Sequence, residues 1–80
     1  MLTSEDNVLC IKFDNIENVQ EFSRIANEFT GDVDLYQGRV IIDGKSLLGI
    51  YSMDIEKEIK IKIYNGSLEE FSLKIKRFLV

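Results

Sequence analysis

One stretch near the end of the chain allows only one kind of local structure. From Ile59 to Tyr64, isoleucines alternate with lysines before the closing tyrosine. β-Branched residues favour extended backbone, and an alternation with period two places all the isoleucines on one face. The pattern predicts a strand over 58–64 with one buried face. Such a strand needs a sheet around it and a second layer to cover it.

Three further segments have the same extended character. Residues 8–13 alternate so that Leu9, Ile11 and Phe13 share one side, with Cys10 on the less buried side. Residues 33–36 and 39–42 flank a turn signal at Gln37-Gly38, so 33–42 predicts a hairpin. Four strands are therefore expected.

Helical patterns separate these strands. Asp14 or Asn15 is placed to cap a helix over 16–29, and Gly31 suits a left-handed position at its end. Ser46 is placed to cap a short helix of roughly two turns, and Ser67 to cap a last helix. The long helices have apolar stripes at helical spacing: Ile16, Val19, Phe22, Ile25, Ala26 and Phe29 in the first, and Leu68, Phe71, Ile75, Phe78 and Leu79 in the last.

The element order is therefore β-α-β-β-α-β-α. One apolar face on each strand and one apolar stripe on each long helix predict an α+β fold of two layers, with a four-stranded sheet covered by helices on one face. Eighty residues make a single domain, 1–80, in which the polar residues 1–7 are expected to be loosely held.

The composition excludes several classes of function. The chain has no histidine and one cysteine, Cys10, so it lacks the usual general base and cannot build a zinc site. We therefore expect no enzymatic activity, no metal and no cofactor. A net charge of −4 argues against a nucleic-acid partner. No segment is apolar enough for a signal peptide or a membrane span, so we expect a cytoplasmic protein without membrane contact.

The segment from Asp43 to Tyr51 holds the candidate functional residues. Gly44-Lys45-Ser46 superficially suggests a nucleotide-binding loop, but five residues separate Gly38 from Gly44 where that loop needs four. Ser46 has two compatible interpretations. Its hydroxyl caps the short helix, or it is phosphorylated, since a helix start accommodates a phosphate.

The apolar residues after Ser46 also have two interpretations. A helix this short cannot bury all of them, and Ile50 with one leucine suffices for packing. The remainder of Leu47, Leu48 and Tyr51 would form a small exposed apolar patch of the kind that marks a docking site.

The run from Asp43 to Met53 resembles the regulatory-serine segment of HPr, the phosphocarrier of the sugar phosphotransferase system. Phe22, Ala26, Phe29 and Val33 also fall where that family keeps core residues. The resemblance covers roughly residues 8–80. It implies the HPr fold, an open-faced sandwich with an antiparallel sheet. It also implies that Ser46 is the regulatory phosphorylation site and that Lys45, Leu47, Leu48 and Tyr51 dock partners.

The phosphotransfer loop of that family is missing. HPr proteins carry a histidine in a Gly-x-His-x-Arg-Pro loop, and the histidine's place falls at about Asn15 here, with Glu17 and Asn18 in place of arginine and proline. An asparagine amide is not nucleophilic enough to accept a phosphoryl group. Asp14 and Glu17 would repel its charge.

These observations favour a regulatory or binding module that acts through the Ser46 helix, with a protein partner such as an HPr kinase or a transcriptional regulator. Two alternatives stay open at this stage. The chain could be a phosphocarrier that uses another residue, or a purely structural assembly domain.

Overall fold

The computed structural model describes residues 8–80, and the expectation for residues 1–7 lies outside this range. The predicted order of elements is confirmed, with one short 3₁₀ turn added at the end. In chain order the elements are β1 (Val8–Ile11), α1 (Ile16–Glu28), β2 (Asp32–Gln37), β3 (Val40–Asp43), α2 (Leu47–Tyr51), β4 (Ile59–Tyr64), α3 (Leu68–Lys74) and η2 (Lys76–Phe78).

The four strands form one antiparallel sheet in the order β1-β4-β2-β3. The isoleucine–lysine strand β4 lies inside the sheet, between β1 and β2. Ile61 of β4 is opposite Leu9 on one side and Leu35 on the other. Ile59, Ile61 and Ile63 are all buried. The alternation of isoleucine and lysine in β4 therefore determines which face of the sheet is buried.

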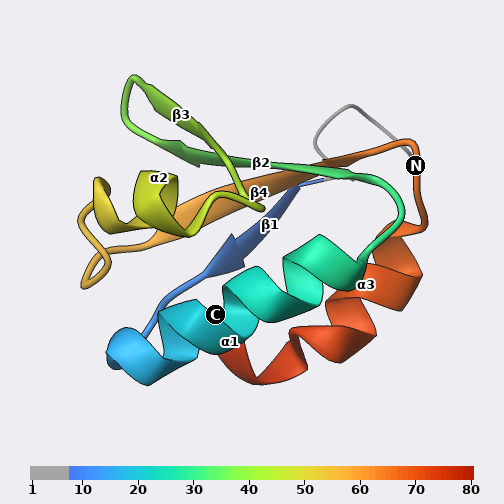
Figure 1. Ribbon diagram of the computed structural model, residues 1–80, viewed down its shortest axis with the longest axis horizontal. Coiled ribbons are helices and arrows are strands. Elements are labelled where there is room, and N and C mark those ends of the chain that lie inside the picture. The colour runs from blue at the N-terminus through green and yellow to red at the C-terminus, as the bar shows by residue number, and fades with distance from the viewer. Residues whose placement is uncertain (1–7) are drawn as a thin grey trace.

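Helices α1 and α3 lie side by side over that face (Figure 1). Phe22 of α1 joins the two layers. Its ring packs edge-on against Phe13, Phe71 and Phe78, with centroid distances of 5.5, 6.0 and 6.2 Å. Edge-to-face contacts of this kind add to the free energy gained from burying the rings. The predicted two-layer sandwich is confirmed. No helix among residues 8–80 is long and apolar enough to cross a membrane.

No helix among residues 8–80 covers the other face of the sheet. Tyr36 of β2 lies on it beside Lys60 of β4. The hydroxyls of Tyr36 and Tyr64 lie 3.2 Å apart, and this hydrogen bond raises the pKa of Tyr36 above its ordinary value. Cys10 is half-buried on β1, in agreement with its predicted side.

Two details of the predicted first helix are wrong. The spacing predicts that Ile16 belongs to the apolar stripe, but 53% of it is exposed, because the helix begins there and the first buried position is Val19, a turn later. Gly31 has no left-handed backbone; among residues 8–80 only Gly38 and Asn65 have positive φ. Gly31 is required instead by close packing, since a Cβ there would lie 2.6 Å from the carbonyl oxygen of Tyr64.

The predicted last helix is also too long. α3 ends at Lys74, and the chain continues through η2 toward the edge of β1. There the carbonyl of Phe78 accepts from the N–H of Lys12 at 3.0 Å, and the N–H of Val80 donates to the carbonyl of Cys10 at 3.0 Å. Backbone hydrogen bonds with β1 replace those of a continued helix, and Phe78 is still buried.

Candidate functional site

Ser46 caps α2, as predicted. It has extended backbone (φ −97°, ψ 105°), and its Oγ accepts a hydrogen bond from the N–H of Gly49 at 3.0 Å. Its carbonyl accepts from the N–H of Ile50 at 3.0 Å. A capping hydroxyl of this kind contributes about 1 kcal/mol to stability. Ser46 is exposed, so the structural role and access by another protein are compatible.

The turn before Ser46 is held by its own backbone and by Asp43. The N–H of Ser46 donates to the carbonyl of Asp43 at 3.0 Å, and the N–H of Lys45 donates to the Asp43 carboxylate at 2.9 Å. The N–H of Gly44 donates to the carbonyl of Val33 at 2.7 Å. The turn is therefore fixed to β2, and Ser46 follows it in one defined position.

Lys45 points back toward α1. Its ammonium donates to the carbonyl of Phe29, the residue that ends α1, at 2.9 Å. A cation at this place satisfies a carbonyl that the helix leaves unpaired and complements the helix dipole. The structure thus gives Lys45 a structural contact, and its role in docking stays a prediction.

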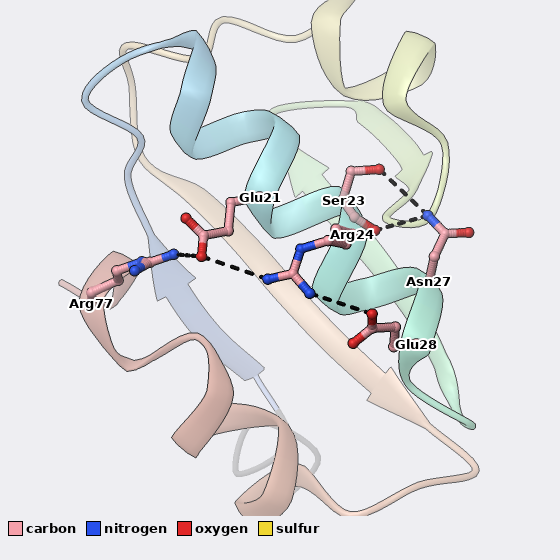
Figure 2. Close-up of polar contacts among 6 residues, drawn as sticks. All are labelled: Glu21, Ser23, Arg24, Asn27, Glu28 and Arg77. Carbon is pink, nitrogen blue, oxygen red and sulfur yellow. Dashed lines mark hydrogen bonds and ion pairs between the residues drawn. The ribbon is translucent and has the colours of Figure 1, made fainter.

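Asn27 connects the same turn to the body of α1, a contact that no local sequence pattern indicates. Its Nδ2 donates to the carbonyl of Lys45 at 2.9 Å and to the carbonyl of Ser23 at 2.8 Å. Figure 2 shows Asn27 and Ser23 reaching toward one another on consecutive turns of the helix. Asn27 and Lys45 together join the end of α1 to the start of α2.

The apolar residues of α2 divide between the core and the surface. Ile50 is fully buried and Leu47 packs half-buried against the core, whereas Leu48 is 81% exposed and Tyr51 37%. The expectation that not all of these residues would be buried is confirmed. α2 has only five residues, less than the predicted two turns. We call Leu47, Leu48 and Tyr51 the α2 surface.

Gly49 allows α2 to pack closely on the sheet. A Cβ at this position would lie 2.6 Å from the Cγ2 of Ile42 and 3.1 Å from the Oγ of Ser46. Any larger residue would therefore push α2 away from β3 and disturb the cap.

The loop after α2 is fixed by Gln37, a contact that the sequence also did not indicate. The Nε2 of Gln37 donates to the carbonyl of Asp54 at 2.8 Å, and its Oε1 accepts from the N–H of Asp54 at 2.8 Å. A side-chain amide that pairs with both backbone groups of one residue acts like a short piece of strand. It holds the end of the α2 segment against the β2–β3 hairpin.

Asn15, near which the resemblance predicts the histidine's place, caps α1. Its Oδ1 accepts from the N–H of Asn18 at 2.9 Å, and the Oδ1 of Asn18 accepts from the N–H of Asp14 at 3.1 Å. The two asparagines form a reciprocal cap, similar to the pairing in a capping box. The side chain of Asn15 thus stabilises the start of the helix, and its amide has no nucleophilic chemistry.

The groove between α1 and the C-terminal segment has a volume of about 470 Å³ and is lined mainly by charged residues. Glu21 forms ion pairs with Arg24 and Arg77, and Arg24 also pairs with Glu28 at 3.3 Å (Figure 2). All of these side chains are at least one-third exposed, so each pair contributes little to stability. This face of α1 is therefore solvated.

Neither a protein-family model nor a curated protein sequence matches the chain. Its fold is similar to two solved structures of bacterial proteins. One is the histidine-containing phosphocarrier protein of a mycoplasma, with a TM-score of 0.71, 16% identity and coverage of 88% of this chain and 85% of that one. The other is Crh, the catabolite repression protein of Bacillus subtilis, with a TM-score of 0.66, 23% identity and coverage of 85% and 79%.

At these identities the likeness concerns the fold, and it agrees with the resemblance that the segment around Ser46 indicated. Both neighbours span nearly the same length as this chain. The chain therefore has the HPr fold, the fold of the histidine-containing phosphocarrier protein and of Crh.

Proposed function

We propose that this chain is a non-catalytic binding module that docks a protein partner through the α2 surface and is regulated by phosphorylation of Ser46. The observation that carries the proposal is the position of Leu48. It is 81% exposed two residues after an exposed capping serine, on a helix where Ile50 is buried and Leu47 packs half-buried against the core. An exposed leucine beside a half-buried leucine and an exposed tyrosine forms an apolar patch suited to docking.

Histidine phosphotransfer is not part of the proposal. Asn15, at about the position where the resemblance implies the histidine, caps α1, and the chain has no histidine anywhere. Asp14 and Glu17, on either side, are both exposed carboxylates. They would repel an incoming phosphoryl group, whereas the arginine expected in the family would attract it.

A phosphate on Ser46 would change the α2 surface directly. It adds a charge of about −1.5 to −2 within two residues of Leu48. Lys45, the nearest cation in sequence, carries one positive charge and is held at the carbonyl of Phe29, so the phosphate would still leave a net negative charge on this surface. Phosphorylation would therefore convert an apolar docking surface into an acidic one and change which partner binds.

The two proteins of similar fold and the exposed Ser46 support the kind of protein partner that we propose. Crh is described as a catabolite repression protein, and the other neighbour as a phosphocarrier. By analogy we propose a transcriptional regulator or an HPr kinase as the partner, and a cytoplasmic location.

Capture of partners from native cytosol tests the docking surface. We compare the wild-type chain with the Leu48→Glu variant and use Leu73→Glu as the matched control, because Leu73 is 68% exposed on a different helix. The proposal predicts a partner retained by the wild type and the control and lost from Leu48→Glu. A partner that binds all three chains equally, or recovery of the chain alone, would refute docking through α2.

A further inference from the structure

Strand β3 is an open edge of the sheet. Among residues 8–80 it pairs only with β2, and in Figure 1 no drawn element lies along its outer side. Its apolar side chains are unusually accessible, with Val40 44% and Ile41 60% exposed. Sheet edges are commonly protected by a proline, a charged side chain or a bulge; β3 contains no proline or bulge, and its one charged residue is Asp43 at its end.

The backbone of β3 has hydrogen-bonding groups free for a partner strand. Gln37 is opposite Val40 across a two-residue turn, so this pair closes the hairpin with hydrogen bonds. Bonded and non-bonded pairs alternate in an antiparallel ladder. The N–H and C=O groups of Ile41 therefore point away from β2, toward the open edge.

The charges at the two ends of β3 are complementary to each other. Arg39 precedes the strand and Asp43 ends it. Among residues 8–80 neither side chain forms an ion pair, and one oxygen of the Asp43 carboxylate accepts from the N–H of Lys45. If two copies of β3 pair antiparallel about a two-fold axis at Ile41, Arg39 of each copy lies opposite Asp43 of the other. The same register places Val40 opposite Ile42 and Ile41 opposite Ile41.

We propose that β3 pairs antiparallel with β3 of a second copy of this chain, in the register centred on Ile41, to form one continuous eight-stranded sheet. The partner strand belongs to a second copy of this chain, because Arg39 and Asp43 at the two ends of β3 supply both members of each ion pair. A two-fold axis also joins the β3 edges of both copies, so neither β3 edge is left for further growth. This surface is separate from the α2 surface and does not depend on the proposed function.

The contact is short, so the dimer is weak and depends on concentration. Ion pairs at its exposed rim also make it weaker at high salt. Sedimentation velocity from about 10 μM to about 1 mM covers the range in which such an equilibrium is visible. The proposal predicts a monomer–dimer equilibrium in the wild type. A chain that is monomeric throughout this range would overturn it.

Charge substitutions at the two-fold axis test the register. In the Ile41→Lys variant two cations face each other, and in Ile41→Glu two anions do, so each variant alone should be monomeric. An equimolar mixture should form the heterodimer, because opposite charges then meet at the axis. A dimer that persists in either variant alone, as exchange of another segment would give, contradicts the proposal. An equimolar mixture of the two variants that stays monomeric also contradicts the proposal.

Hydrogen exchange of the wild type provides a second measurement that needs no substitution. The amide of Ile41 should become protected as the concentration rises, whereas that of Ile42, already paired with β2, should not change. Equal behaviour of the two amides at all concentrations would overturn the pairing.

Discussion

The ammonium of Lys45 donates a hydrogen bond to the carbonyl of Phe29 at 2.9 Å, and so connects the turn before Ser46 to the end of α1. The contact joins residues 16 positions apart in the sequence. It makes the position of α2 depend on the end of α1, so the two segments should lose stability together.

Replacing Lys45 tests this connection. The Lys45→Met variant keeps the aliphatic stem but leaves the carbonyl of Phe29 without its donor, at a cost of about 1–2 kcal/mol in the free energy of unfolding. Urea denaturation measures the loss. The control is Lys57→Met, which removes a side chain that is 78% exposed and lies 3.9 Å from Asp54, and should change stability by less than about 0.5 kcal/mol. Equal effects of the two substitutions would show that the contact of Lys45 is not structural.

Replacing Asn27 should act locally on the turn. The Asn27→Ala variant removes the hydrogen bond to the carbonyl of Lys45 while it improves helix propensity, so the net loss is about 0.5–1 kcal/mol. Hydrogen exchange should show faster opening of the Ser46 and Gly49 amides. Gln20→Ala, on the exposed side of the same helix, should leave both amides unchanged.

Ser46 substitutions separate capping from other roles. Ser46→Ala removes the acceptor for the N–H of Gly49 and should destabilise the protein by about 1 kcal/mol. Ser46→Asp retains a capping oxygen and should unfold at nearly the wild-type urea concentration. If Ser46→Ala proved as stable as the wild type, the observed hydrogen bond would contribute nothing.

Gln37 should control the loop after α2. The Gln37→Met variant has similar length but leaves the N–H and carbonyl of Asp54 to water, so we expect faster exchange of the Asp54 amide and a stability loss of about 1 kcal/mol. Unchanged exchange at Asp54 would mean that the loop is held by other contacts.

The sequence predicts those parts of the structure that depend on local patterns. The alternation of β4, the caps at Ser46 and Ser67 and the division of α2 into buried and exposed residues all follow from neighbours within a few positions. Gln37–Asp54 and Asn27–Lys45 could not be predicted, because each joins residues 17 or 18 apart that only the folded chain brings together.

The predictions for Ile16 and Gly31 are wrong for the same reason, because a local pattern does not show tertiary packing. The spacing of Ile16 fits the apolar stripe, but spacing does not show where the covering layer ends. Gly31 follows a helix, as a left-handed glycine often does, yet its small size is needed because the backbone of Tyr64 packs against it. The local motif around Ser46 predicts where the candidate site lies. The contacts of Asn27 and Gln37 that hold the site in place are tertiary.

The proposed function depends on whether a partner recognises the α2 surface and modifies Ser46. Incubation with an HPr kinase and ATP, followed by mass spectrometry, tests both points because the kinase must dock next to the serine it modifies. The account predicts one phosphate on Ser46 in the wild type and in Leu73→Glu, none in Ser46→Ala and much less in Leu48→Glu. No phosphate on the wild type, or a phosphate on another residue, would contradict it.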